Sequence, residues 1–149
     1  MDQREIASFR HYLRKIERYL FKNLKVDEEC CGSVSFNECH ILMELSRSSD
    51  IAMADLISGL GLDKSVVTRT VDKMVRSGLI VRKENPEDRR MKALSLTDRG
   101  KATAVSINSH MNGKFTRLFA SLEGDNGLET LRSAQIMASV FAKWDTLED

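Results

Sequence analysis

The chain has 149 residues, enough to bury one hydrophobic core without disulfides, and its 23 Lys and Arg residues against 22 Asp and Glu leave a formal charge of only +1. This balance excludes a whole-chain electrostatic signal for nucleic acid, membrane or acidic substrate, so any such signal must be local. With no basic-then-apolar leader and no apolar run near the roughly 18 residues that span a membrane, we expect a cytoplasmic protein with no membrane partner.

A long helix is predicted over residues 4–24, followed by a loop. Apolar residues recur in it every three or four positions, which gives a helix one apolar face, while Arg and Lys occupy the other. The next helix is predicted to begin after Ser35, because Glu38 follows three residues later as in a capping box, and to run through Leu45. The apolar face of the first helix consists of Ile6, Phe9, Leu13, Ile16 and Leu20.

Two further helices are predicted in the centre of the chain, a short one over 53–60 and a longer one over 64–77, joined by a tight turn. Asp63 is suited to cap the second of these helices and Gly78 to end it. At roughly 100° per residue the second helix has two distinct faces. One is apolar, with Val67, Val71, Met74 and Val75, and the other is polar, with Ser65, Thr68, Arg69, Asp72 and Arg76.

A β-hairpin and two more helices complete the chain. Residues 79–84 are predicted to form a strand, 85–90 a turn and 91–96 a returning strand, in which Met91, Leu96 and either Ala93 or Leu94 compete for the inward register. Thr97 then caps a long helix, and a loop around residues 124–127 leads to a last helix over 128–144. The stripe of the long helix is Ile107, Met111, Phe115, Leu118 and Leu122, and that of the last is Leu131, Ala134, Ala138, Phe141 and Ala142.

The order of the central elements is that of a helix-turn-helix followed by a β-wing, whose second helix enters the DNA major groove. Between Lys64 and Lys92 there are nine basic residues against four acidic ones, an excess of five positive charges on a chain whose total is +1. Basic charge is thus concentrated where helix and wing would meet phosphate. The predicted DNA contacts are Ser65, Thr68, Arg69, Lys73, Arg76, Arg89 and Arg90.

The predicted hairpin turn carries two of these residues, Arg89 and Arg90, at its tip. A narrow minor groove has a negative potential that attracts arginine, and Asp88 is placed to pair with one of the two guanidinium groups. The alternative is a solvated turn without function. The turn follows a two-faced helix and a predicted strand, and this position favours the DNA-binding interpretation.

Residues 63–100 resemble the winged helix-turn-helix of the MarR family of bacterial transcriptional regulators. The family's wing pattern, Asp-x-Arg followed by apolar alternation and Leu-Thr-x-x-Gly, is present as Asp88, Arg90, Leu96, Thr97 and Gly100. The resemblance implies a homodimer in which the N-terminal helix and the two C-terminal helices of both subunits intertwine and the paired recognition helices read a pseudo-palindromic operator. It also implies that Arg90, rather than Arg89, enters the minor groove.

The terminal helices favour a dimer independently of the family. A stripe as long as that from Ile107 to Leu122 exceeds what one small central domain covers, so a second chain is the natural partner, and the alternative is a monomer that folds these helices onto itself. The fold class we predict is mainly α with a small β-wing. Its parts are an N-terminal dimerisation helix (1–30), a winged helix-turn-helix domain (31–97) and C-terminal dimerisation helices (98–149).

Three cysteines, an odd number without an export signal, indicate reduced thiols at rest. Acidic neighbours of Cys30 and Cys31 raise thiol pKa values and argue against a peroxide-sensing thiolate, and adjacent cysteines do not wrap a zinc ion well, so no metal site is predicted. Cys39 fits a small buried apolar role. The sharper hypothesis is that Cys30, Cys31 and Cys39 together sense a metalloid, an oxidant or another thiol-reactive effector.

A small-molecule effector is the other candidate, because family members commonly bind one between the dimerisation helices and the winged domain. Tyr12, Tyr19 and Phe21 fit an apolar effector pocket and a dimer core equally well. His11 and His110 fit either a pocket or a helix surface. No cofactor is required by any of these interpretations.

Other classes of protein have weaker support. The sequence contains no Gly-rich phosphate loop, nucleophile elbow or His-Glu-x-x-His motif, so we predict that the protein is not an enzyme. A winged-helix module that docks a protein partner is the main alternative, and the basic helix face argues against it. We therefore predict a dimeric, sequence-specific regulator of transcription, a repressor by family expectation, released from its double-stranded DNA operator by an effector.

Overall fold

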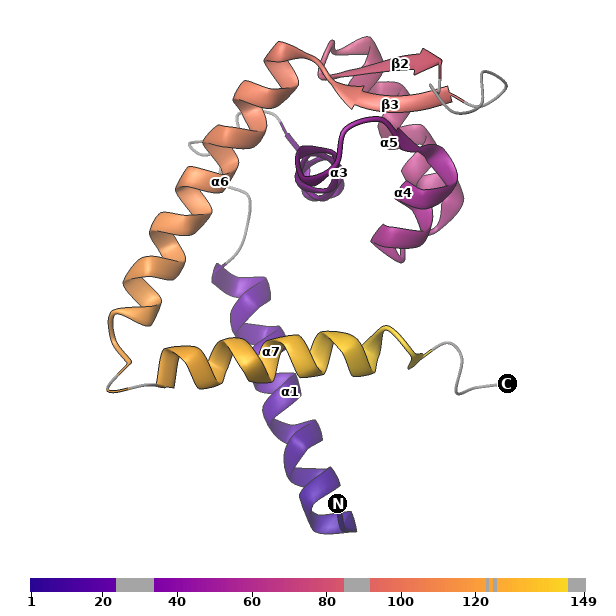
Figure 1. Ribbon diagram of the computed structural model, residues 1–149. Helices are drawn as coiled ribbons and strands as arrows, with labels where there is room; N and C mark the ends of the chain where they lie inside the picture. The colour runs from indigo at the N-terminus through magenta and orange to yellow at the C-terminus, as the bar shows by residue number, and fades with distance from the viewer. Residues whose placement is uncertain (24–33, 85–91, 123, 125, 145–149) are drawn as a thin grey trace. The chain divides into compact units, whose positions relative to one another are not determined.

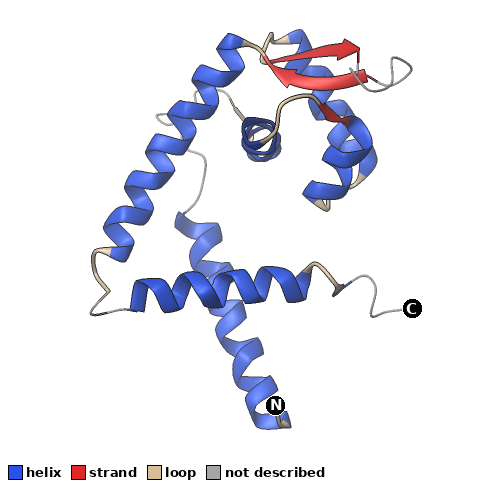
Figure 2. Ribbon diagram, in the orientation of Figure 1, coloured by secondary structure: helices blue, strands red, loops and turns tan. Residues whose placement is uncertain are grey.

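The computed structural model describes residues 1–23, 34–84, 92–122, 124 and 126–144 (Figure 1). Helices dominate these ranges and the strands are few and short, which confirms the predicted fold class (Figure 2). In chain order the elements are α1 (Gln3–Asn23), α3 (Phe36–Arg47), β1 (Ile51–Ala52), α4 (Met53–Leu60), α5 (Lys64–Arg76), β2 (Ile80–Glu84), β3 (Lys92–Leu96), α6 (Asp98–Phe119) and α7 (Asn126–Phe141).

The first core helix, α3, begins with the predicted capping box. The Ser35 side chain accepts a hydrogen bond from the Glu38 backbone, and the Glu38 carboxylate accepts one from the Ser35 backbone N–H at 2.7 Å. This reciprocal arrangement satisfies two backbone donors that a helix start leaves unpaired. Ile41, Leu42 and Leu45 on the inner face of α3 are buried, so the helix is held both at its end and along its length.

The strands form one antiparallel sheet in the order β1-β3-β2, with Ile80 opposite Leu96 at one end of the hairpin and Glu84 opposite Lys92 at the other. The short β1, which the sequence did not reveal, pairs Ile51 with Leu94 on the other edge of β3. In Figure 1, α3 and α4 lie on the same side of the β2–β3 pair.

Of the residues predicted to compete for the inward register of β3, Met91 lies outside the described residues, and the others need not compete because both faces of the strand are covered. Ala93, Leu94, Ser95 and Leu96 are all buried. A strand between two others, with helices packed on it, does not show the alternation of a half-exposed strand. The polar member of the set, Ser95, donates a hydrogen bond to the Asp50 carboxylate, so its burial leaves no unpaired hydroxyl.

The Leu-Thr-x-x-Gly motif closes the wing against the end of α5. Thr97 donates from its backbone N–H to the carbonyl of Leu79 at 3.1 Å and from its hydroxyl to the carbonyl of Gly78 at 2.7 Å. The same hydroxyl accepts from the Gly100 N–H at 3.0 Å and so caps α6 as predicted. A Cβ at position 100 would lie 2.1 Å from the Leu79 carbonyl oxygen, and only glycine permits this approach.

The terminal helices carry large apolar side chains that stay exposed. In α1 and α7, which are described in full, no residue is buried. Phe9, Ile16 and Leu20 on α1 are exposed, as are Leu131 and Ile136 on α7. Within the described ranges, no helix combines the length and the apolar character that crossing a membrane requires.

Gly100→Ala is expected to destabilise the protein by about 1–3 kcal/mol, because its methyl group would overlap the Leu79 carbonyl and push α6 away from the wing. The measurement is the free energy of unfolding from urea titration. Gly59→Ala in α4 is the control, since a Cβ there meets only ordinary contact at 3.7 Å and should gain up to about 1 kcal/mol of helix propensity. Equal stability of the two variants would contradict the close-approach argument.

Candidate nucleic-acid interface

The helix α5 is defined at both ends by its sequence. Gly61 adopts a left-handed conformation with φ of 60° at the end of α4, and Asp63 then caps α5 by accepting hydrogen bonds from the N–H groups of Ser65 at 2.7 Å and Val66 at 3.4 Å. A hydrogen bond from the Ser65 side chain, followed by those from the Ser65 and Val66 backbone N–H groups, lowers the pKa of the Asp63 carboxyl. At the other end Gly78, with φ of 71°, ends the helix as predicted.

The two predicted faces of α5 are separated by burial. Val67, Val71 and Met74 are fully buried, which fixes the rotation of the helix about its axis. Ser65 and Arg69 are exposed on the other side and Thr68 is partly exposed. Because the apolar face is held in the core, the polar face is presented to a partner outside the domain.

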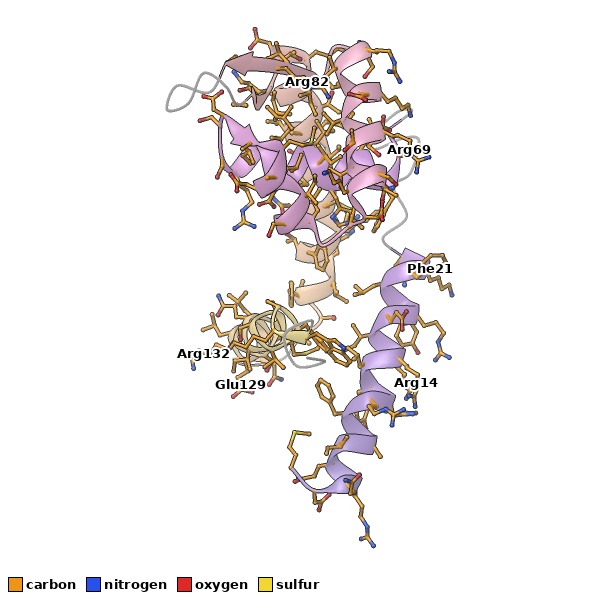
Figure 3. The ribbon with its side chains drawn as sticks, turned by 90° about the vertical axis from the view of Figure 1, so that its right-hand side faces the viewer. Arg14, Phe21, Arg69, Arg82, Glu129 and Arg132 are labelled. Atoms are coloured by element: carbon orange, nitrogen blue, oxygen red, sulfur yellow. The ribbon has the colours of Figure 1, made fainter. Side chains whose placement is uncertain are left out.

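The exposed side chains near the start of α5 form a small connected group. The Arg69 guanidinium donates to the Ser65 backbone carbonyl at 3.2 Å and to its hydroxyl at 3.4 Å, and the Thr68 hydroxyl donates to the Lys64 carbonyl at 2.7 Å. Figure 3 shows Arg69 projecting outward from the helix. Together with Asp63, these residues line an open concavity of about 670 Å³ at the helix start.

Asp72, one turn after Thr68, connects α5 to the wing. Its carboxylate pairs with the Arg82 guanidinium of β2, and Figure 3 shows Arg82 beside the sheet. Both side chains are about one-third exposed, so solvent screens the pair and its main effect is on orientation. The wing strand β2 is therefore tied to the same helix whose polar face is presented.

Lys73, predicted as a DNA contact, has a partner inside the protein. Its ammonium lies 3.1 Å from the carboxylate of Glu38 on α3, whose side chain is 3% exposed. Burial acts to raise the pKa of Glu38, but hydrogen bonds from Ser35 and the charge of Lys73 outweigh it and leave the pKa lowered. This pair joins α3 to α5. Arg76, in the last turn of α5, is exposed.

Four of the predicted site residues are outside the described residues, namely Arg89 and Arg90 of the predicted wing tip, and Cys30 and Cys31. Cys39, expected to be buried, is only partly buried, because it lies in the first turn of α3 beside the exposed His40. Among the described residues, no group of three or more His, Cys, Asp or Glu side chains is placed to hold a metal ion.

The candidate effector residues are divided among separate elements. Tyr12, Tyr19 and Phe21 are exposed on α1, where the imidazole of His11 meets the Tyr12 ring edge-on at 5.4 Å. His110 lies on α6 and is partly buried.

Three residues of the interface region escaped the sequence analysis as site residues. Lys64 lines the concavity, and its place at the first position of α5 was the available signal. The sequence pattern identifies Glu38 only as a capping residue and does not single out Arg82, although each forms an ion pair with a residue of α5. Their ion-pair partners are 10 residues away for Arg82 and 35 residues away for Glu38. At such separations an ion pair produces no recognisable spacing in the sequence.

Comparison with known proteins agrees with this geometry. A family model described as the MarR family matches residues 33–91. The chain is 30% identical over 104 residues to the uncharacterised HTH-type transcriptional regulator YdgJ of Bacillus subtilis, covering 70% of this chain and 63% of that protein. It is 24% identical over 111 residues to the HTH-type transcriptional repressor YetL of the same organism, covering 73% and 65%. The chain is therefore similar to the MarR family over residues 33–91, the part that contains the helix-turn-helix.

Solved structures of the MarR fold extend the match over nearly the whole chain. A MarR family protein from Bacillus stearothermophilus superimposes with a TM-score of 0.80 at 19% identity, covering 96% of this chain and 99% of that one. A point mutant of S. aureus MepR, solved bound to an oligodeoxyribonucleotide, has a TM-score of 0.58 at 18% identity, covering 89% and 97%. The chain spans slightly less than two thirds of the length of its two curated relatives, which are named as transcriptional regulators and not as enzymes.

Glu38→Gln is expected to lower stability by about 1 kcal/mol near neutral pH, because glutamine keeps the capping box but loses the ion pair with Lys73. Since the pKa of Glu38 is lowered by folding, its contribution is complete above the unfolded-state value of about 4.3 and is lost as pH falls through the folded value. Urea titrations from pH 7 to pH 3 should therefore show the variant and the wild type converging in acid.

Glu44→Gln on the same helix is the matched control for this pH dependence, since its carboxylate takes part in none of the ion pairs found among the described residues. It should leave the difference between neutral and acid stability unchanged. A Glu38→Gln variant that stays less stable than the wild type by the same amount at every pH would show that the charge of Glu38 is not the cause.

Proposed function

We propose that the protein is a dimeric, sequence-specific DNA-binding regulator of transcription that represses from a pseudo-palindromic operator in the cytoplasm. The observation that carries the proposal is the exposed polar face of α5, with Ser65, Thr68 and Arg69 opposite a fully buried apolar face. Hydroxyl and guanidinium groups of this kind hydrogen-bond base edges and phosphates in the major groove. The name of YetL as a repressor and the MepR–oligonucleotide structure support the assignment.

The dimer is supported by the exposed apolar faces of α1 and α7. Side chains such as Phe9, Ile16 and Leu131 cost free energy when exposed to water, and a second copy of the chain would cover them by two-fold symmetry. Two recognition helices related by a two-fold axis read half-sites about one helical turn apart. The operator would then share the symmetry of the protein.

The wing contributes the second set of contacts in this proposal. Arg89 and Arg90 at its tip are proposed to reach the minor groove, and Arg82 holds the base of the wing to α5 through Asp72. Arg76 is proposed to bind phosphate beyond the bases that Arg69 reads. The Lys73 side chain is 59% exposed although it pairs with Glu38. We propose that it adds a phosphate contact while this ion pair stays in place.

Release from DNA is proposed to follow binding of an effector that changes the spacing of the two recognition helices. The effector is either a small molecule or a metalloid or oxidant that reacts with Cys30, Cys31 and Cys39, and no cofactor is required. The second candidate function is docking of a protein partner through helix and wing. The salt dependence of binding distinguishes it from DNA binding. Phosphate binding weakens steeply with salt through counterion release, and a protein contact does so much less.

Selection of bound duplexes from a random pool tests the proposed function first. The purified protein should enrich a pseudo-palindrome with half-sites about 10 base pairs apart. Arg69→Ala should then lose on the order of 1–3 kcal/mol of specific binding if Arg69 reads a base, and less, with a shallower salt slope, if it binds only phosphate. Arg132→Ala on α7 removes the same charge far along the chain and should change neither quantity. Failure to enrich any sequence would favour the protein-docking alternative.

The cysteine hypothesis is tested by replacing Cys30, Cys31 and Cys39 together with serine. If these thiols sense the effector, a trivalent arsenical or peroxide should release the wild-type protein from the selected operator and leave the variant bound. Fluorescence anisotropy of labelled operator DNA measures both. Release of the variant at the same inducer concentration would exclude the thiols and move the search to a small-molecule pocket.

A further inference from the structure

A second concentration of basic charge lies outside the helix-turn-helix, on α1. Between Gln3 and Asn23 there are six Lys and Arg residues and two Glu, an excess of four positive charges on a chain with a total of +1. All six basic side chains are exposed. None of them forms an ion pair with a carboxylate among the described residues. They are Arg4, Arg10, Arg14, Lys15, Arg18 and Lys22.

Four of these residues form a row that winds gradually around the helix. Arg10, Arg14, Arg18 and Lys22 follow one another at intervals of four, so their Cα atoms are about 6 Å apart along the helix and the row is about 18 Å long. At about 100° per residue the four lie within an arc of roughly 120° that contains no carboxylate. Figure 3 shows Arg14, in the middle of the row, projecting away from the helix.

The row is unfavourable for an isolated helix. Like charges four residues apart destabilise a helix by about 0.2–0.5 kcal/mol for each pair, and the row contains three such pairs. One neighbouring aromatic ring offsets part of this repulsion, since the Arg18 guanidinium lies 5.7 Å from the Tyr19 ring centroid. An anionic partner along the row would remove the repulsion altogether.

The apolar face of α1 lies on the opposite side of the helix. Phe9, Leu13 and Leu20 are centred about 160° from both Arg18 and Lys22 and about 120° from Arg14 on the helix circumference, so a partner that covers them leaves these three basic residues in solvent, with Arg10 nearer the edge. In the proposed dimer that partner is the second subunit. The basic row would then form an exposed surface on each side of the dimer.

The geometry of the row favours one kind of anion. A compact carboxylate ligand would reach only one or two of four groups spread over about 18 Å, whereas duplex DNA has a phosphate about every 3.4 Å along each strand. An anionic membrane is less suitable, because interfacial helices insert their apolar face, and in the dimer that face is already covered. Three of the four groups are guanidinium groups, which bind phosphate through two parallel hydrogen bonds.

We propose that the basic row of α1, Arg10, Arg14, Arg18 and Lys22, is a second DNA-binding surface that binds the phosphate backbone of duplex DNA outside the segment read by α5. The surface carries no base-reading groups and therefore adds affinity without sequence preference. This inference rests on the proposed function, because a second surface for DNA presupposes a first. It predicts that the protein binds long DNA more tightly than its operator alone.

The test compares the full-length wild-type protein with an Arg10→Gln, Arg14→Gln, Arg18→Gln variant. The matched control is Lys101→Gln, Arg117→Gln, Arg132→Gln, which removes three exposed charges from α6 and α7. Affinity is measured for the selected operator in a duplex of about 20 base pairs, for the same operator with flanks extending it to about 60, and for a duplex of random sequence, over a range of salt concentrations.

We expect the wild type and the control to gain about tenfold on the long duplex and the α1 variant to lose that gain, while its affinity for the short operator changes less than about twofold. On the long duplex, the slope of log affinity against log salt should fall by about 0.9 for each phosphate contact removed. Sedimentation should show all three proteins with the same subunit number.

Several outcomes would overturn the inference. The α1 variant could keep the gain on long DNA, the control could lose it equally, or the α1 variant could become monomeric, which would place the row in the subunit interface. Vesicles of anionic lipid that bind the wild type but not the variant, with the DNA gain unchanged, would assign the row to a membrane. Absence of any selected operator would instead refute the proposed function. The comparison of the α1 variant with the wild type on the random duplex would then still show whether the basic row binds DNA.

Discussion

The orientation of α5 about its own axis is the constraint on which the DNA-binding proposal depends. A rotation by one residue, roughly 100°, would turn Ser65 and Arg69 out of the presented face and bring Val67 toward solvent. Burial of Val67, Val71 and Met74 opposes this rotation, since each apolar side chain contributes on the order of 1.5–3 kcal/mol when it leaves water. The apolar face therefore specifies the polar one.

Two ion pairs from consecutive residues act on the same helix from different sides. Asp72 reaches β2 through Arg82, and Lys73 reaches α3 through Glu38. The pairs differ in character, because Asp72 and Arg82 are partly solvated whereas Glu38 is buried and already accepts the Ser35 N–H of its own capping box. A carboxylate with several fixed hydrogen-bond donors holds its position rigidly. The pair with Glu38 on α3 therefore fixes the position of α5 more firmly than the pair with Arg82 on the wing does.

Local sequence patterns predicted most of the elements, and contacts distant in sequence account for what they missed. The caps of α3, α5 and α6 and the two faces of α5 follow from spacing within one or two turns, and the structure has each of them. The strand β1 did not follow, because two residues are too short to show alternation and their pairing with β3 is decided about 40 residues later. The burial of both faces of β3 escaped prediction for the same reason. Family resemblance, rather than any local pattern, supplied the operator symmetry.

The distribution of charge links the fold to its proposed task. A chain with a net charge of +1 that holds its positive charge on α5, the wing and one side of α1 must carry negative charge elsewhere. Such a protein gains little from general attraction to DNA and binds only where its basic surfaces meet the duplex in the right geometry. In the proposed dimer, two-fold symmetry would present every surface twice, so each local excess of positive charge would act at two places on a symmetric operator while the net charge of the dimer stayed small. A modest local excess of positive charge is then sufficient for binding to DNA. Binding depends on how the basic surfaces are oriented toward the duplex and less on the total charge of the protein.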